Sequence, residues 1–469
     1  MRRRVQHVHF VGIGGVGMSG IAELLHNQGY RVTGSDLREG AATARLRSLG
    51  VGVHIGHDAS QVGDADVVVY SSAVRPSNPE LKAAQTGGRI VIPRAEMLAE
   101  IMRLKEGIAV AGSHGKTTTT SLIAHVLDRA GLDPTSVIGG RVLAQKGALP
   151  GARLGAGEIL VAEADESDGS FLRLAPAIAV ITNIDPEHLD HYGSVEALRD
   201  AFADFANRVP FWGLVVLCLD HPGVQAILPR ISRRKLSYGF SSQSELVAEN
   251  VALAPDRGGM NFDVRLRGEA LGRVELPLFG RHNVGNALAT LAVALELELP
   301  FATAAEGIAG FQGVERRFET VGRAAGVRVV DDYGHHPAEV RATLGAARQV
   351  HQGRVVVAFQ PHRYTRTRDL WDEFATAFND ADVLLLTEVY AAGEDKLPGI
   401  ESGALAEAIR AHGHRDVRFV PDLEEVLAEL SRSVRPGDLV LTLGAGSIST
   451  LARRLLAQLE ADSGGAPNP

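Results

Sequence analysis

The chain of 469 residues contains a single cysteine, Cys218, which excludes an intrachain disulfide and any metal site built from several thiolates. This cysteine lies in the apolar run 214–219, which favours a buried structural thiol. Positive charge is not in excess either, because 48 Lys and Arg stand against 56 Asp and Glu, giving a net charge of −8. That balance argues against a nucleic-acid protein held by bulk electrostatics.

The sequence also lacks long hydrophobic runs. No stretch of 18 apolar residues occurs, and no apolar signal segment follows the arginines at 2–4. We therefore expect a cytoplasmic protein without membrane association. Hydrophobic residues make up 45% of the chain and charged residues 22%, which is ordinary for a globular protein. At roughly 150 residues per domain, the length favours about three domains.

The first glycine-rich segment follows a predicted strand at 7–11 and reads G-x-G-x-x-G, with glycines at Gly12, Gly14, Gly15 and Gly17. A helix to about residue 28 and a second strand ending at Asp36 complete a dinucleotide-binding fingerprint. Taken alone, this pattern predicts a nicotinamide dehydrogenase. Its physics requires only that a diphosphate approach the backbone and that a hydroxyl meet Asp36. A UDP-sugar satisfies that description equally well.

Further parallel strands are predicted at 51–54, 66–70 and 90–93. Their carboxyl ends place His57, Ser71, Ser72 and Arg94 at the edge where open α/β sheets bind ligands. Each of these polar residues also has an ordinary interpretation as a cap or turn residue. We expect this first domain to span residues 1–106.

A second glycine-rich segment follows the apolar run 107–111 and precedes a helix from 117 to about 130. Strand, glycine loop and helix start form a phosphate cradle, in which Lys116 reaches the outer phosphates and Thr117 holds Mg²⁺. The consensus G-x-x-x-x-G-K-[ST] is not met, because Val110 replaces its first glycine. The alternative, a tight turn with a solvated lysine, leaves the glycines and threonines unexplained. The residues of this cradle are Gly112, Ser113, His114, Gly115, Lys116, Thr117 and Thr118.

Four acids lie close together after the predicted strand 159–162, at positions 163, 165, 166 and 168. In a chain with a phosphate loop, they indicate an Mg²⁺ site, since hard cations take oxygen ligands. Glu163 is the preferred ligand, and the alternative is a solvated acidic loop. His188 follows the next strand, 177–182, and is a weaker candidate because single histidines are usually hydrogen-bonded loop residues.

Short alternating segments between 220 and 280 predict antiparallel strands, and a helix follows to about 299. Asn283 and Asn286 lie three residues apart in its first turn, either as caps or facing one ligand. Strands at 327–330, 354–359, 383–387 and 439–443 predict a third α/β section. The histidines after these strands do not indicate zinc, because thiolates and an HExxH spacing are both missing.

Seven segments, taken together and in this order, resemble the bacterial Mur ligases over roughly residues 7–455. They are GIGGVGMSGIAE at 12–23, AGSHGKTTTT at 111–120, EADESDGSF at 163–171, NIDPEHLDHY at 183–192, GRHNVGNALA at 280–289, DDYGHHPAE at 331–339 and FQPHRYTRT at 359–367.

The resemblance implies an α/β protein of three domains. These are a UDP-sugar-binding Rossmann-like domain (1–106), a central P-loop-type ATPase domain with a small antiparallel sheet (107–321) and a C-terminal Rossmann-like domain (322–469). It further implies an enzyme that uses ATP and Mg²⁺ to convert the lactoyl carboxylate of UDP-N-acetylmuramate into an acyl phosphate. The amine of L-alanine then attacks. Closure of the third domain, with hinges near 107 and 322, and a monomer or weak dimer are expected.

The resemblance also assigns roles to individual residues. It implies that Lys116 binds the phosphates and that Mg²⁺ is held by Thr117, Glu163 and His188. It implies nucleotide contacts by His282, Asn283, Asn286, Arg317 and Asp332. The residues implied to bind the amino acid and the acyl phosphate are Tyr333, His335, His336, His362, Arg363 and Arg366. One of the histidines 335, 336 and 362 is the candidate base for the amine.

One departure concerns a modified lysine that several related ligases use for a second Mg²⁺. No lysine occurs here between Asp190 and Arg234, which is typical of the alanine-adding member and leaves the ligands of a second ion open. Two alternatives also stay open: a recycling ligase that attaches a preformed peptide to the same UDP-sugar, and a non-catalytic nucleotide-binding regulator.

Overall fold

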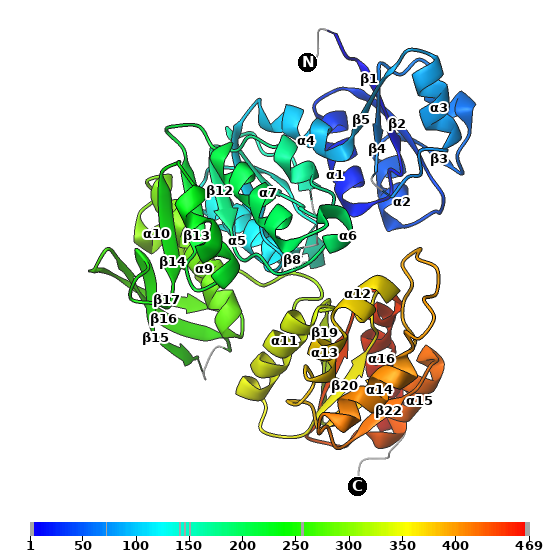
Figure 1. Ribbon diagram of the computed structural model, residues 1–469, viewed down its shortest axis with the longest axis vertical. Helices are drawn as coiled ribbons and strands as arrows, with labels where there is room; N and C mark the ends of the chain where they lie inside the picture. Colours follow the sequence, from blue (N-terminus) through cyan, green and yellow to red (C-terminus); the bar gives the residue numbers. More distant parts are fainter. Residues whose placement is uncertain are drawn as a thin grey trace. The chain divides into compact units, whose positions relative to one another are not determined.

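The computed structural model describes residues 4–71, 73–139, 142–144, 147–149, 152–254 and 258–464. The chain forms two compact units. The first, unit 1, comprises Met1–Ala252, Asn261–Pro277 and Asn283–Gln312; unit 2 comprises Leu253–Met260, Leu278–His282 and Gly313–Pro469. Figure 1 labels their helices and strands. Within the described residues, no helix has the length and apolar character needed to span a membrane.

Unit 1 begins with a five-stranded parallel sheet in the order β3-β2-β1-β4-β5. The strands are β1 (His7–Val11), β2 (Arg31–Asp36), β3 (Gly52–Ile55), β4 (Val67–Tyr70) and β5 (Ile90–Pro93). The helices are α1 (Val16–Asn27), α2 (Ala41–Ser48), α3 (Pro79–Thr86) and α4 (Arg94–Met102). Strand β1 is buried along its whole length, as a central parallel strand requires. The strand order reverses direction between β1 and β4, where such sheets bind ligands.

A ten-stranded sheet follows, in the order β10-β7-β11-β6-β12-β13-β14-β15-β16-β17. Its first part consists of β6 (Glu106–Ala111), β7 (Thr135–Val137), β10 (Ala152–Arg153), β11 (Ile159–Glu163), β12 (Ile178–Ile181), β13 (Leu214–Cys218) and β14 (Lys235–Gly239). The helices here are α5 (Lys116–Arg129), α6 (Leu189–Tyr192), α7 (Val195–Asn207) and α8 (Pro222–Ile227). Strand β6, which leads into the phosphate loop, lies at the centre between β11 and β12.

The strands expected between 220 and 280 are β15 (Leu246–Leu253), β16 (Met260–Leu266) and β17 (Glu269–Leu276). They extend the edge of the same sheet, because β15 pairs in parallel with β14. A separate two-stranded sheet is formed by β8 (Val142–Ala144) and β9 (Gly147–Leu149). Helices α9 (Arg281–Glu296) and α10 (Phe301–Ala309) follow.

The two sheets of unit 1 pack through α1 and β10. A Cβ on Gly20 of α1 would lie 2.6 Å from the Cβ of Ala152, so the absence of a side chain permits this approach. An ion pair of 2.7 Å joins Arg173 to Glu96 of α4. One hydrophobic core continues from the first sheet into the second. The glycine-rich loop and the acidic segment are thereby held in one body.

Unit 2 contains a six-stranded sheet in the order β18-β19-β23-β20-β21-β22. The strands are β18 (Glu319–Ala324), β19 (Val327–Asp332), β20 (Val355–Phe359), β21 (Val383–Leu386), β22 (Val417–Phe419) and β23 (Leu439–Leu443), and only β18 runs antiparallel to its neighbour. The helices are α11 (Pro337–Val350), α12 (Tyr364–Asp369), α13 (Trp371–Ala375), α14 (Ser402–Ala411), α15 (Leu423–Ser433) and α16 (Leu451–Gly464). Two separate apolar clusters cover this sheet, as in doubly wound folds.

Candidate active site

The phosphate loop joins β6 to α5 and depends on two glycines with positive φ. Gly112 has φ +135°, and a Cβ there would collide with the hydroxyl of Thr182. Gly115 has φ +84°, and its Cβ would lie 2.8 Å from Oδ1 of Asn286. Both positions therefore need glycine for backbone conformation and for space. The loop leads directly into the N-terminus of a 14-residue helix, which favours an anion.

The segment after β12 holds this loop in place. The backbone N–H of His114 donates to Oδ1 of Asn183 at 2.7 Å, and its carbonyl accepts from Nδ2 of Asn183 at 2.9 Å. The same carbonyl accepts from the Thr182 hydroxyl at 2.6 Å. The backbone N–H of Asp185 donates to the Ser113 hydroxyl at 2.9 Å. These bonds fix the loop without occupying the N–H groups at the helix start.

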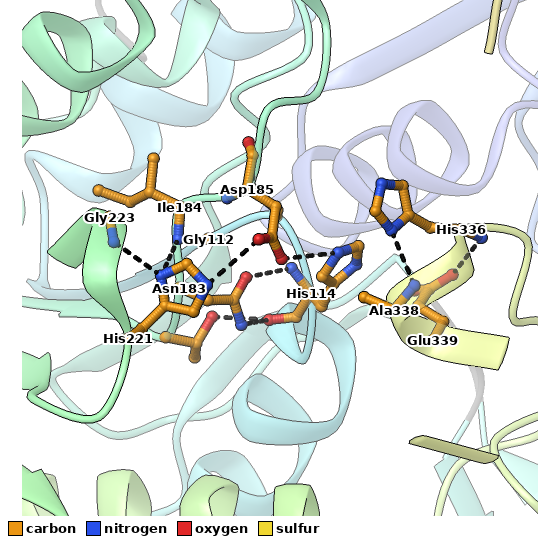
Figure 2. A network of polar contacts seen from close by, with 12 residues as sticks. Gly112, His114, Asn183, Ile184, Asp185, His221, Gly223, His336, Ala338 and Glu339 are labelled. Carbon is orange, nitrogen blue, oxygen red and sulfur yellow. Dashed lines mark hydrogen bonds and ion pairs between the residues drawn. The ribbon is translucent and has the colours of Figure 1, made fainter. Parts of the chain in front are cut away.

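Asp185 also bridges two histidines, as Figure 2 shows. Its carboxylate lies 3.2 Å from Nε2 of His114 and 3.2 Å from Nε2 of His221. Nδ1 of His221 accepts the backbone N–H groups of Ile184 and Gly223, so the proton of this ring lies on Nε2 and points at Asp185. Burial works against ionisation of Asp185, but the two histidines outweigh it and hold the pKa of that carboxyl well below its usual range.

The ammonium group of Lys116 contacts two backbone carbonyls and one carboxylate. Its Nζ donates to the carbonyls of Gly112 at 2.5 Å and Ser113 at 3.3 Å, and lies 2.8 Å and 2.9 Å from the two carboxylate oxygens of Glu166. Burial raises the pKa of Glu166 to about 7. Burial opposes the charge on Lys116 too, but Glu166 and Asp165 raise the pKa of the lysine, which stays cationic. A carboxylate thus contacts the cation that the sequence assigns to phosphate.

Three ligand-type side chains gather beside this lysine. Ligand atoms of Glu166, Glu187 and His188 lie within 4.8 Å of one another. Glu163, the preferred ligand from the sequence, lies outside this group among the described residues, and its Oε1 accepts the backbone N–H of Gly139 at 2.7 Å. The oxygen-rich set suits a hard divalent cation.

The two predicted asparagines of α9 face the phosphate loop. The hydroxyl of Thr119, in the first turn of α5, donates to Oδ1 of Asn286 at 3.1 Å. Nδ2 of Asn286 in turn donates to Oδ1 of Asn283 at 3.0 Å. Both asparagines are buried. They form a polar connection between α9 and the start of α5.

The N-terminal glycine loop lies at the carboxyl edge of the first sheet, as predicted. Gly12 has φ +83°, and a Cβ there would touch Ser71 at the end of β4. The carboxylate of Asp36 accepts the backbone N–H of Gly14 at 2.8 Å. A Cβ on Gly17 would lie 3.2 Å from Nη1 of Arg94, so this guanidinium covers the helix start. Gly15 is the N-cap of α1, and Ser72 lies outside the described residues.

A cavity of about 250 Å³ adjoins this edge within unit 1. It is lined by Tyr70, Pro93, Arg94, Ala95, Asp168, Gly169, Ser170 and Arg173. The lining combines the ends of β4 and β5 with the acidic segment that follows β11. Two guanidinium groups, of Arg94 and Arg173, line the cavity together with the side chain of Asp168.

In unit 2, polar side chains gather after β19 and β20. Asp332 is buried and accepts the backbone N–H groups of Phe318 and Gly334, both at 2.7 Å; burial raises its pKa to about 6. The rings of His335 and His362 lie 5.5 Å apart. Burial, His335 and the neighbouring arginines lower the pKa of His362 to about 3.

The remaining predicted residues of unit 2 have structural partners here. Arg366 contacts Nδ1 of His362 at 3.3 Å, and Arg363 adopts a positive φ of 69° at the start of α12. Arg317 pairs with Glu339 at 3.5 Å. Nδ1 of His336 accepts the backbone N–H of Ala338 and caps α11 (Figure 2). For His282, burial and Arg317 lower the pKa to about 4. Tyr333 lies beneath Arg317, 5.2 Å from its guanidinium carbon.

Sequence reasoning did not single out His221 or Glu80, although both support predicted residues. The Glu80 carboxylate is fully buried and contacts His57 at 2.6 Å. His221 precedes Pro222 at the start of a six-residue helix, which is a common cap position with no catalytic signature. Each acts on a partner more than 20 residues away, so no local pattern reveals it.

Comparisons with known proteins agree with this geometry. Three family models match in order: "Mur ligase family, catalytic domain" over residues 7–106, "Mur ligase middle domain" over 110–294 and "Mur ligase, glutamate ligase domain" over 316–446. The UDP-N-acetylmuramate–L-alanine ligase of Sorangium cellulosum is 59% identical over 466 residues, which covers 98% of each chain.

Solved structures give the same result. The UDP-N-acetylmuramate–alanine ligase of Thermotoga maritima superposes with a TM-score of 0.82 at 31% identity, covering 97% of this chain and 99% of that one. The murein peptide ligase of Psychrobacter arcticus shares the fold, with a TM-score of 0.72 at 24% identity over 99% and 100% of the two chains. The α/β, three-domain expectation is confirmed. The chain belongs to the Mur ligase family.

Proposed function

We propose that this chain is an ATP-dependent ligase that joins L-alanine to the lactoyl carboxylate of UDP-N-acetylmuramate. The observation that carries the proposal is the presence, in one compact unit, of two different glycine loops, each between a parallel strand and a helix. One loop contains a half-buried lysine, Lys116, and the other contains none. A dehydrogenase has no use for the loop with Lys116 and its acidic neighbours.

In this proposal the phosphate loop positions ATP for attack by the carboxylate. Two negatively charged groups must approach each other, so Lys116 has to neutralise charge on the transferred phosphoryl group. Its present partner Glu166 must give way when phosphate oxygens arrive. Asn283 and Asn286 support the start of α5 and are proposed, with His282, to contact the nucleotide. The same holds for Arg317 and Asp332 in unit 2.

The donor set beside Lys116 fits a magnesium ion. Glu166, Glu187 and His188 offer ligand atoms within 4.8 Å of one another, and Thr117 follows Lys116 in the first turn of α5. A bound Mg²⁺ would offset the charge of the phosphates and of the attacking carboxylate. We therefore propose Glu166 and Glu187 as ligands in addition to Glu163 and His188.

We further propose that the rim of unit 2 binds the incoming amino acid. Arg363 and Arg366 offer positive charge to its carboxylate, and one of the histidines 335, 336 and 362 is proposed as the base for its ammonium group. His362, with its pKa near 3, is a weak base and more suitable for a hydrogen bond. The boundaries 1–106, 107–321 and 322–469 remain our proposal for the three domains.

The proposal is tested by phosphate release from ATP. Release should require UDP-N-acetylmuramate and L-alanine together, with little release when either is omitted. Release that needs neither substrate, or only one of them, would contradict it. Stabilisation by NAD but not by UDP in a thermal-shift assay would favour the dehydrogenase instead.

The recycling ligase is the second candidate, because the murein peptide ligase shares this fold. The two are separated by the mass of the product when L-alanine and a preformed L-alanyl peptide compete at equal concentration. We expect the L-alanine adduct. A product that carries the whole peptide would overturn the assignment while leaving the ATP and UDP-sugar sites in place.

A further inference from the structure

The N-terminal sheet contains a buried carboxylate that the proposed chemistry does not use. Glu80 lies in the first turn of α3 and its side chain is 0% exposed. Its carboxylate accepts three hydrogen bonds: from Nε2 of His9 at 2.6 Å, from the hydroxyl of Ser35 at 2.7 Å and from Nδ1 of His57 at 2.6 Å. A buried carboxylate with three donors is ionised and firmly placed. Burial opposes this ionisation, but the three donors lower the pKa of Glu80 overall.

Inside the sheet, the same network continues through β1 and β2 to the opposite end of the strands. The hydroxyl of Thr33 lies 2.8 Å from both Nδ1 of His9 and Nε2 of His7, and Nδ1 of His7 lies 2.9 Å from Asp64. Because Nε2 of His9 faces the carboxylate of Glu80, this nitrogen carries a proton, and the interior end of Glu80 faces a donor.

The other end of Glu80 determines the state of His57. Because Nδ1 of His57 faces the carboxylate, with Ser35 also 3.0 Å away, the ring proton lies on Nδ1. Nε2 is then a hydrogen-bond acceptor. Among the described residues Nε2 has no hydrogen-bond partner, and the side chain is 13% exposed.

His57 lies where a ligand of this sheet would pass. It follows β3 at the carboxyl edge of the sheet. Ser35, whose hydroxyl donates to Glu80, is adjacent in sequence to Asp36, and the Asp36 carboxylate accepts the backbone N–H of Gly14. The buried carboxylate thus fixes an acceptor, Nε2 of His57, on the same edge as the glycine loop. An acceptor held this way recognises a donor group and rejects an analogue that lacks it.

We propose that Glu80 is a positioning residue that presents Nε2 of His57 as the acceptor for a hydrogen-bond donor of the uridine. This inference rests on the proposed binding of a UDP-sugar at this edge. The donor is either the imide N–H of the uracil ring or a ribose hydroxyl. Both chemistries require the same state of the histidine, and analogues of UDP distinguish them.

The test is a thermodynamic cycle between ligand and protein. Calorimetric titration of the full chain with UDP, 3-methyl-UDP and 2′-deoxy-UDP should show that one analogue binds wild type about tenfold more weakly than UDP, the effect of one hydrogen bond. In His57→Phe and in Glu80→Met, that analogue should bind as well as UDP does. Variants that weaken UDP and analogue equally would show a structural role only and overturn the proposal. Equal binding of all three ligands to wild type would also overturn it.

Two control variants distinguish the positioning of His57 by Glu80 from a general effect on the stability of the protein. Asp64→Ala removes a similar histidine–carboxylate contact at the opposite end of β1 and should leave the analogue ratio at about tenfold. Glu80→Gln keeps an acceptor for His57 and should retain the discrimination that Glu80→Met loses. A wild-type protein that binds no UDP at all would contradict the proposed function rather than this inference.

A measurement without substitution at Glu80 addresses the state of the ring. Nitrogen NMR of the intact protein with labelled histidine, assigned with His57→Phe, should show Nδ1 protonated and Nε2 unprotonated at neutral pH. A ring of His57 protonated on Nε2, alone or together with Nδ1, would overturn the proposal even if Glu80→Met failed to fold.

Discussion

The two glycine loops of unit 1 share a plan and differ in what holds them. Each follows a central parallel strand, contains a glycine with positive φ and leads into a helix. In the N-terminal loop, the carboxylate of Asp36 accepts the N–H of Gly14. In the phosphate loop, the amide of Asn183 and the hydroxyl of Thr182 hold the backbone of His114.

The cationic side chain beside each loop also comes from a different part of the chain. Lys116 belongs to the phosphate loop itself, whereas Arg94 reaches the N-terminal loop from the start of α4. The two loops thus share the order of strand, glycines and helix and differ in the source of the cation and in the bracing side chain. Each of these groups can be removed separately.

Replacing Lys116 should have the largest effect. Lys116→Ala removes the half-buried cation from the phosphate loop, and we expect phosphate release to fall by at least about 10²–10³-fold. Binding of the UDP-sugar, measured by calorimetry, should not change. The exposed Lys82 on α3 provides a matched control, and Lys82→Ala should retain activity. Loss of UDP-sugar binding in Lys116→Ala would show that the two loops are not independent.

Arg94→Ala should affect the other loop. Loss of one charged donor corresponds to about 1.5–3 kcal/mol, so KM for the UDP-sugar should rise about 10–100-fold while KM for ATP stays constant. Arg103, at the end of the same helix, pairs with Glu100 on the surface and serves as the control. Steady-state kinetics with each substrate varied in turn gives both constants. A rise in both would mean that Arg94 supports the packing of unit 1 as a whole.

The element order and both loops could be predicted from the sequence because their signals are local. Gly112, Gly115 and Lys116 are close neighbours, and a positive φ demands glycine at the first two positions. In the N-terminal loop, a positive φ demands glycine at Gly12, and the Asp36 carboxylate leaves little room for a Cβ at Gly14. A strand, a turn and a helix start each leave a pattern a few residues long.

The bracing groups could not be predicted in the same way. The carboxylate of Glu166 contacts Lys116, whereas the carboxylate of Glu163 accepts the backbone N–H of Gly139. The path of the chain after β11 gives these two nearby acids their different partners. Asp185 meets His221 through the pairing of β12 with β13, and sequence spacing does not encode the approach of these side chains. Composition revealed the acids, and only the fold shows which acid meets which cation.

A pair of glycine substitutions sharpens the comparison at smaller amplitude. Gly115→Ala places a Cβ 2.8 Å from Asn286 at a positive φ, which costs about 1–3 kcal/mol, so KM for ATP should rise about tenfold or more. Gly14→Ala places a Cβ 2.9 Å from the Asp36 carboxylate and should raise KM for the UDP-sugar by less. Gly345, whose Cβ would meet nothing within 4 Å, is the control. If either variant changed KM for ATP and KM for the UDP-sugar equally, the two loops would not bind separate substrates.

The smallest effect concerns the aspartate that supports the phosphate loop. Hydrogen bonds from His114 and His221 outweigh burial and hold the pKa of Asp185 below its ordinary value of 3.8. A depressed carboxyl pKa stabilises the folded state above the unfolded pKa, and this contribution is lost as pH falls through the folded pKa. Asp185→Asn should therefore lower Tm by a constant amount between about pH 5 and pH 8, and the difference should shrink only below about pH 4. Asp58→Asn, at an exposed cap far from both loops in the sequence, provides the reference. A difference in Tm that already declines between pH 5 and pH 7 would mean that titration of the histidines, and not the ionised Asp185, stabilises this loop.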